Sequence, residues 1–203
     1  MLIGAEALVR LQSETGELIP PFLFIHILEE TGLIPKLDLY VFEEVCKFIK
    51  SSEENNLPLI RISVNISRCD ISDKTFIEKL ESIRKSYGVS PKHIHVEITE
   101  TAIIEGETTI IDAVNQFHKL GYTVEMDDFG SGYSSLNVLK NIDFDVLKLD
   151  LKFIRGAINN SRGGTILSSV IRMAKWLQIP VIAEGVETLK QADFLKSIGC
   201  NYI

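Results

Sequence analysis

Residues 122–136 read YTVEMDDFGSGYSSL, and the rest of the chain is organised around them. A short strand, Tyr122–Asp127, ends in two adjacent carboxylates, Asp127 and Asp128; a glycine loop and a helical pattern follow. An α/β enzyme places metal ligands at the carboxyl edge of its sheet in this way. Two adjacent aspartates repel each other unless a cation or a proton neutralises them. The alternative is an aspartate that only caps the next helix.

The composition is that of a folded globular chain, with 203 residues, 45% of them hydrophobic and 24% charged. The net charge of −7 argues against a nucleic-acid groove or a membrane-surface face, because both need basic patches. Bound divalent cations would still allow a small anionic ligand, since they invert the local sign of the charge.

The three cysteines are widely spaced and form no CxxC pair, which predicts core thiols in a reducing compartment. The N-terminus has no basic leader, and no apolar run approaches membrane-spanning length. The sequence therefore predicts a soluble, cytoplasmic segment. It leaves open a membrane tether on a longer parent protein.

Strand-like and helix-like segments alternate along the chain. Strands are expected at 2–9, 60–67, 94–100, 122–127, 146–150 and 180–184, with the opening of one more at 200–203. Helices are expected at 24–30, 37–50, 74–87, 108–120, 163–177 and 190–198. This alternation predicts an α/β fold whose parallel sheet closes as a (β/α) barrel. No GxGxxG follows the first strand and no P-loop is present, which argues against nucleotide cofactors of those classes.

Polar side chains, almost all oxygen donors, stand at or near the carboxyl ends of the expected strands. They are Glu6, Asn65, Glu97, Asp127, Asp128, Lys148 and Glu184. Helix capping does not explain this set, because Glu is a poor N-cap and Lys is not one. Hard oxygen ligands without a His or Cys cluster favour Mg²⁺ or Mn²⁺ over zinc. Paired aspartates with further carboxylates suit two metals, on the order of 3.5–4 Å apart, that clamp a phosphoryl group.

Two members of this set have structural alternatives. Glu6 would be costly to bury in mid-strand unless it is paired or bound to a metal, but it could face water on an exposed edge strand. Lys148 is expected to stabilise charge on a phosphoryl group, but it could instead pair with Asp150 on the same strand face.

The chain resembles the EAL domain family, bacterial phosphodiesterases that cleave the second messenger cyclic di-GMP. The triplet Glu6-Ala7-Leu8 lies in GAEALVR. It is followed in family order by SVNIS (63–67), VEITE (96–100), MDDFGSGYSSL (126–136), LKLD (147–150) and IAEGVET (182–188). The resemblance implies a TIM-like (β/α) barrel of the EAL type. It also implies hydrolysis of one phosphodiester bond, giving the linear dinucleotide pGpG.

The resemblance also implies a role for each residue of the set. One Mg²⁺ or Mn²⁺ would be held by Glu6, Asn65, Glu97 and Asp127, and a second by Asp127, Asp128 and Glu184. Lys148 would contact the attacking water or the phosphoryl oxygens, and Glu184 is also a candidate general base. Arg10 matches the family's phosphate contact.

Further implied residues lie around the glycine loop. Glu100 would anchor this loop, which contains Gly130, Ser131 and Gly132, and the loop would lie near a homodimer surface. Glu187, in IAEGVET, is another candidate site residue. The implied partners are cyclic di-GMP, a second copy of the chain, and sensor or GGDEF-type domains fused to it in the parent protein.

The chain departs from the family pattern in three ways. Leu11 stands where Trp is common, and Ser131 replaces the usual Thr. The third departure is at the ends: residues 1–203 are expected to form an EAL domain that lacks its first strand and most of its last. Such a barrel would expose two strand edges, so the segment alone is expected to aggregate or to pair with a second chain.

Two other functions compete with a metal-dependent phosphodiesterase. One is a binding-only module that senses cyclic di-GMP or a partner protein without turnover, and the other is a structural barrel with accidental acids. Every ligand residue expected in the covered stretch is present, and this favours an enzyme.

Overall fold

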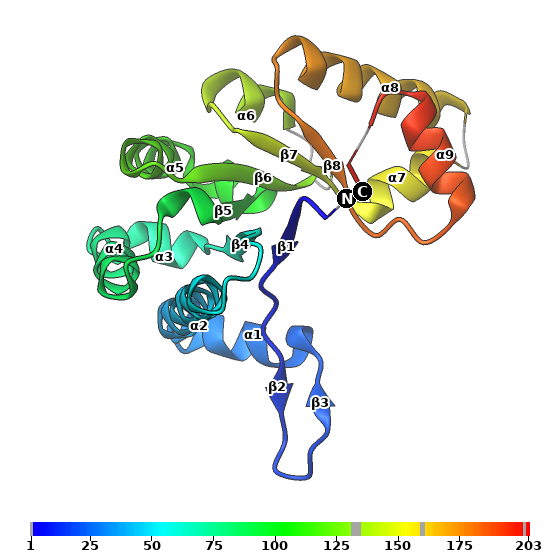
Figure 1. Ribbon diagram of the computed structural model, residues 1–203. Coiled ribbons are helices and arrows are strands. Elements are labelled where there is room, and N and C mark those ends of the chain that lie inside the picture. Colours follow the sequence, from blue (N-terminus) through cyan, green and yellow to red (C-terminus); the bar gives the residue numbers. More distant parts are fainter. Residues whose placement is uncertain (1, 131–134, 159–160, 201) are drawn as a thin grey trace. The chain divides into compact units, whose positions relative to one another are not determined.

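The computed structural model describes residues 2–130, 135–158, 161–200 and 202–203 (Figure 1). The chain forms two compact units, residues 1–97 with 108–122 and residues 98–107 with 123–203. Helix α5 (Glu100–Leu120) contributes its beginning to the second unit and the rest to the first. Each unit has its own strands and helices.

The first unit is built on three parallel strands, β1 (Gly4–Glu6), β4 (Arg61–Asn65) and β5 (Ile94–Thr99). Strand β1 pairs with β4, and β4 pairs with β5 so that Asn65 lies opposite Glu97. Parallel strands end at the same edge of a sheet. This register therefore brings the polar ends of β1, β4 and β5 to one edge.

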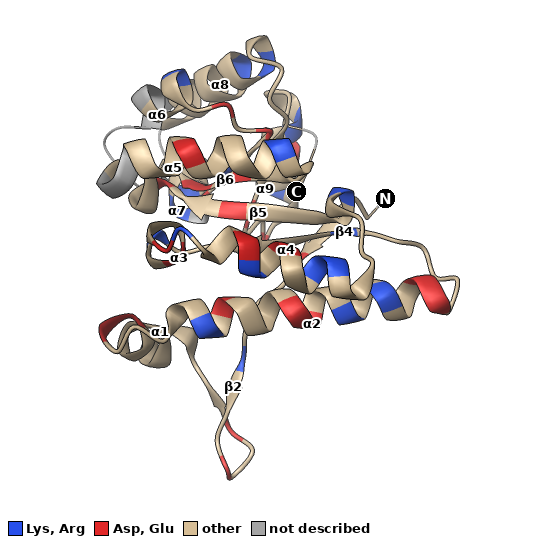
Figure 2. Ribbon diagram, turned by 90° about the vertical axis from the view of Figure 1, so that its left-hand side faces the viewer, with Lys and Arg blue, Asp and Glu red and all other residues tan. Residues whose placement is uncertain are grey.

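The helices of the first unit follow the expected periodicity. Its helical elements are α1 (Pro21–Glu30), α2 (Ile34–Glu54), α3 (Arg68–Ser72), α4 (Phe76–Tyr87) and the 3₁₀ turn η1 (Pro91–His93). Helix α2 buries Phe42, Val45, Cys46 and Ile49, which are three or four residues apart and form one apolar stripe. Lysines and acidic residues alternate along the rest of α2 (Figure 2).

A hairpin occupies part of the segment expected to be a loop between the first strand and α1. It consists of β2 (Leu11–Gln12) and β3 (Leu18–Ile19), which pair antiparallel (Figure 1). Its tip is closed by a hydrogen bond of 2.8 Å from Ser13 N to Glu17 O. Gly16 supplies the positive φ of 88° that the turn requires. The expected first strand is correspondingly short.

The second unit is also built on parallel strands, β6 (Thr123–Phe129), β7 (Val146–Leu149) and β8 (Val181–Ala183). Its helices are α6 (Ser135–Asn141), α7 (Leu151–Ile158), α8 (Ser161–Trp176) and α9 (Leu189–Ser197). Tyr202 makes a parallel bridge to Ile182, so the predicted opening of a further strand is confirmed.

Two short helices, α3 and α7, were not expected from the sequence. Asp150 explains the start of α7, because its Oδ1 accepts hydrogen bonds from Lys152 N (2.6 Å) and Phe153 N (3.3 Å). Ser67 caps α3 in the same way. Helix α5 begins at Glu100 rather than at the expected residue 108.

The expectation of three core thiols is wrong for one of them. Cys46 and Cys200 are buried, and burial raises the pKa of Cys46 to about 12, whereas Cys69 is exposed. In the part of the chain that the structure describes, no helix combines the length and apolar character needed to span a membrane.

Candidate active site

In the first unit, the structure brings Glu6 and Asn65 together. Asn65 Nδ2 donates a hydrogen bond of 2.9 Å to Glu6 Oε1. Glu6 ends β1, and Asn65 ends the neighbouring β4. Glu6 lies on an edge strand, is half-buried and accepts this hydrogen bond, which favours a paired glutamate over one that faces water.

Glu97 lies on β5, opposite Asn65 on β4. Its backbone oxygen accepts a hydrogen bond of 2.9 Å from Ile66 N, which fixes the segment that follows Asn65. The residue is 1% exposed. A carboxylate this deep in a protein is costly unless charge or hydrogen bonds compensate it. Its burial is consistent with a ligand position.

In the second unit, Lys148 joins carboxylates from two neighbouring strands. Lys148 Nζ lies 2.7 Å from Glu184 Oε1 and 3.5 Å from Asp127 Oδ1. Lys148 is 3% exposed, whereas the Glu184 side chain keeps 35% of its surface exposed. Asp150, the alternative partner of Lys148, caps α7 instead. We call Asp127, Lys148 and Glu184 the lysine cluster.

The Asp127–Asp128 pair distorts the end of β6. The pairing of β6 with β7 shifts register between Met126 and Phe129, and Asp128 takes a positive φ of 56°. Burial, followed by the charge of Asp127, raises the pKa of Asp128. A helix-capping aspartate at this position would not need a buried neighbour of the same charge. The geometry therefore favours the predicted use of the pair as a charged site.

The oxygen donors fit a divalent cation in their chemistry. Asp127 Oδ1 is buried and accepts no hydrogen bond from the described residues, although the ammonium of Lys148 is near. Carboxylate and amide oxygens are the ligands that Mg²⁺ and Mn²⁺ prefer. Within the described ranges, no three side chains of Asp, Glu, His or Cys gather closely enough to hold an ion as they stand.

The glycine loop is tied to the start of α5. Gly130 N donates a hydrogen bond of 3.0 Å to Glu100 Oε2, and Glu100 is fully buried, as the predicted anchor would be. Gly130 has a φ of +96°, and a Cβ there would lie 2.6 Å from Phe153 Cγ. Only glycine fits this position. Ser131 and Gly132 lie outside the described residues.

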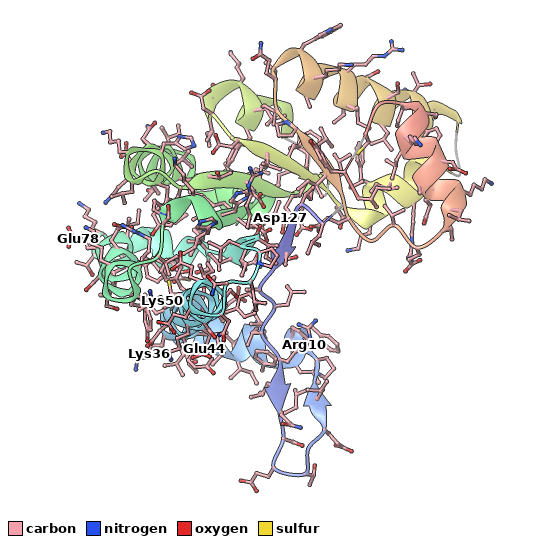
Figure 3. All side chains as sticks on the ribbon, viewed as in Figure 1. Arg10, Lys36, Glu44, Lys50, Glu78 and Asp127 are labelled. Atoms are coloured by element: carbon pink, nitrogen blue, oxygen red, sulfur yellow. The ribbon has the colours of Figure 1, made fainter. Side chains whose placement is uncertain are left out.

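Arg10 and Glu187 each make a contact within their own unit. Arg10 is exposed between β1 and β2, and its Nη1 donates to Val9 O at 2.8 Å (Figure 3). Arg10 and Glu6 also border an open groove of about 440 Å³ beside α2, but Asn65 and Glu97 do not line it. Glu187 pairs with Arg155 Nη2 at 2.6 Å, and both side chains are mostly exposed.

Sequence reasoning missed one residue that shapes the second unit. Phe153, on α7, lies against Gly130, and its ring makes an edge-to-face contact with Phe129 at 6.3 Å. The signal that could have found it is Asp150, an N-cap followed by a helical run. The sequence predicts all three residues of the lysine cluster from their places near strand ends; Asp127 lies on β6 (Figure 3).

Comparison with known proteins gives one family. The model of the EAL domain matches residues 1–203. The chain is 37% identical over 196 residues to "Cyclic di-GMP phosphodiesterase PdeR" of Escherichia coli, covering 97% of this chain and 30% of that protein. It is 30% identical over 200 residues to "Bifunctional diguanylate cyclase/cyclic di-GMP phosphodiesterase MucR" of Pseudomonas aeruginosa, covering 98% and 29%.

A solved structure agrees with these relatives. The chain is similar to "PaMucR Phosphodiesterase, c-di-GMP complex", with a TM-score of 0.91, 30% identity, and coverage of 99% of this chain and 81% of that one. The expected fold class, a TIM-like (β/α) barrel of the EAL type, is therefore confirmed. The chain spans 24% to 38% of the length of the curated relatives it matches. By sequence and by fold, this chain belongs to the EAL domain family.

Proposed function

We propose that this chain hydrolyses one phosphodiester bond of cyclic di-GMP, giving pGpG, with the help of divalent metal ions. Two observations from the relatives support the substrate. PdeR and MucR are named as cyclic di-GMP phosphodiesterases, and the matched MucR structure is a complex with c-di-GMP. The acidic and amide residues that the family resemblance assigns to the site are present in the chain.

The lysine cluster is the observation that carries the proposal. A buried ammonium held between Asp127 and Glu184 is fixed in place by two charged contacts. A phosphodiester gains negative charge on its oxygens as water attacks, and a preorganised cation stabilises that charge without reorganising. A structural ion pair would need only one carboxylate. Lys148 with two carboxylates, one of them partly exposed, suits catalysis better.

Different residues of the chain are proposed to bind the metal ions, accept a proton and contact a phosphate. Glu6, Asn65, Glu97, Asp127, Asp128 and Glu184 would hold divalent cations, which polarise phosphoryl oxygens and acidify a water when bound. Glu184 keeps an exposed carboxylate edge and would accept the proton from the attacking water. Arg10 presents an exposed guanidinium, whose forked donors suit a phosphate oxygen.

Glu100 would keep the end of β6 in place. Its hydrogen bond to Gly130 holds the residue that follows Asp127, Asp128 and Phe129. The proposal also includes a homodimer, and fusion to sensor or GGDEF-type domains, as the names of two relatives, a bifunctional diguanylate cyclase and an oxygen sensor protein, suggest.

The direct test is hydrolysis of cyclic di-GMP by the purified chain, with pGpG separated by chromatography. Turnover is expected with Mg²⁺ or Mn²⁺ and should disappear in a chelator. Asp73→Asn is the matched control, because Asp73 is an acid of the first unit whose contacts are local, to Thr75 and Lys79. Binding of cyclic di-GMP without any turnover would overturn the enzyme and leave a binding module.

A further inference from the structure

A pair of aspartates, Asp38 and Asp70, lies in the first unit, where α2 meets α3. Asp70, at the third position of α3, is fully buried. Its Oδ2 accepts a hydrogen bond of 2.7 Å from Ser67 N, and Ser67 Oγ accepts one of 3.2 Å from Asp70 N. These two bonds form a capping box that starts α3.

The other oxygen of Asp70 is an acceptor that lacks a donor. Asp70 Oδ1 is buried and receives no hydrogen bond from any N–H or hydroxyl of the described residues. The carboxyl group that reaches Asp70 is that of Asp38, half-buried on α2, which also meets the backbone N–H of Ser67. Helices α2 and α3 are in contact, and α3 lies beside the N-terminal end of α2 (Figure 2).

Two carboxylates cannot hydrogen bond to each other, because both are acceptors; one proton turns them into a donor and an acceptor. We propose that Asp38 carries this proton and donates it to Asp70 Oδ1, so that Asp38, Asp70 and Ser67 form a carboxyl clasp between α2 and α3. Asp70 is assigned as the acceptor because its Oδ2 accepts the 2.7 Å hydrogen bond from Ser67 N, which stabilises the charged carboxylate.

Electrostatics supports this assignment. Burial, then the hydrogen bond and the charge of Asp70, raise the pKa of Asp38 to about 9. Within the described residues, the other charged groups on α1, β4, α3 and α4, the elements packed against α2, are His26, Glu29, Glu30, Arg61, Arg68, Glu78, Lys79, Glu81, Arg84 and Lys85; Asp73 lies between α3 and α4. Several are paired locally, Lys79 with Asp73 at 2.8 Å and Arg84 with Glu81 at 2.7 Å. Asp70 is the charged group that acts on Asp38.

The clasp positions the segment that follows Asn65. Ser67 stands two residues after Asn65, and Ile66 between them is bonded to Glu97 O. The hydrogen bonds to the Ser67 N–H therefore limit the motion of the end of β4, which carries the Asn65 side chain. This second part rests on the proposed function, in which Asn65 is a ligand; the shared proton does not.

The sign of the pH dependence follows from the proton. The folded chain keeps the proton of Asp38 up to about pH 9, whereas the unfolded chain releases it near pH 4. The contribution of the clasp is therefore complete at acidic pH and is lost as pH rises towards 9. The melting temperature should fall by about 8–16 °C between pH 6 and pH 9 for this reason alone.

Asp38→Asn is the decisive variant, because its amide donates to Asp70 Oδ1 without needing a proton. The variant should remain folded, and its melting temperature should no longer show the fall of about 8–16 °C between pH 6 and pH 9. Asp70→Asn should do the same, since its amide nitrogen can donate to Asp38 while its oxygen still accepts from Ser67 N. Asp73→Asn is the control and should keep the wild-type slope. A slope in Asp38→Asn equal to that of the wild type would overturn the clasp.

Two further readouts separate the clasp from the proposed function. The carboxyl ¹³C resonance of Asp38 should titrate far above the usual range for aspartate, whether or not the chain is an enzyme. The ratio of kcat of Asp38→Asn to that of the wild type should rise several-fold from pH 6 to pH 9, with KM unchanged. If this kcat ratio stays constant with pH while the melting temperature of Asp38→Asn no longer depends on pH, the clasp stands and only its role in positioning Asn65 is overturned. Absence of all turnover would overturn the proposed function and leave the clasp to be decided by melting and NMR.

Discussion

The carboxylates of the two units have different hydrogen-bonding partners. In the first, Glu6 receives a hydrogen bond from the neutral amide of Asn65; in the second, Asp127 and Glu184 share the ammonium of Lys148. An amide supplies a donor but no positive charge, whereas a buried ammonium supplies both. The second unit therefore contains a positive charge for its own carboxylates, which the Asn65 amide does not supply to Glu6.

Asp127→Asn should produce the largest loss of turnover, because it removes a proposed charged metal ligand and leaves Lys148 and Glu184 in place. Lys148 keeps its 2.7 Å contact with Glu184, so the melting temperature should stay close to that of the wild type. Turnover of cyclic di-GMP should fall by about 1,000-fold. Steady-state hydrolysis and a thermal melt of the same sample measure both; wild-type turnover in the variant would contradict the assignment.

Lys148→Met removes the counter-charge of the second unit and tests the comparison directly. Without metal, Asp127 is left buried beside Glu184, which should cost about 3–5 kcal/mol of unfolding free energy. Mn²⁺ should restore much of this stability, because a cation can replace the ammonium as counter-charge. In saturating Mn²⁺ kcat should still be about 100-fold low. Denaturant melts with Mn²⁺ and with chelator measure the difference, and equal destabilisation in both would refute the role given to Lys148.

Gly130→Ala and Gly88→Ala form a matched pair across the units. Both glycines have positive φ, +96° and +68°, but a Cβ at Gly130 meets Phe153 at 2.6 Å while one at Gly88 meets nothing within 4 Å. Gly88→Ala should cost about 1 kcal/mol of unfolding free energy, and Gly130→Ala about 1–3 kcal/mol more. Equal costs would show that the ring of Phe153 moves aside freely.

Glu187→Gln should produce the smallest change in stability and in turnover. Its pair with Arg155 is short, 2.6 Å, but both side chains are mostly exposed. Exposed pairs contribute at most about 1 kcal/mol, so the melting temperature should barely change. Arg155→Gln should match it. A loss of turnover in Glu187→Gln without one in Arg155→Gln would instead assign the glutamate to the site.

Much of the candidate site follows from the sequence because strands have a simple period. Side chains that end parallel strands meet at one edge, so Glu6, Asn65 and Glu97 in one unit, and Asp127, Lys148 and Glu184 in the other, could be named from position alone. Contacts between segments that are distant in the sequence could not be predicted in this way. The partner of Lys148 depends on how β7 and β8 pair, and the meeting of Asp38 with Asp70 depends on the packing of α2 on α3.

Short elements were the weakest part of the prediction. The hairpin β2–β3 and the helices α3 and α7 are each too brief for an apolar period to emerge. Their starts depend on single side chains, Ser67 for α3 and Asp150 for α7, which hydrogen bond to the backbone. Such residues are common in loops as well, so they become informative only once the following turn is seen to be helical.

The exposed thiol of Cys69 makes the carboxyl clasp accessible to spectroscopy. Cys69 precedes Asp70 on α3, while Cys46 and Cys200 are buried and their raised pKa values keep them as poorly reactive thiols. A maleimide fluorophore or spin label added to the folded native chain should therefore attach at one position. The native chain therefore has an attachment site for a reporter group next to Asp70, the proposed acceptor of the shared proton, and no engineered cysteine is required.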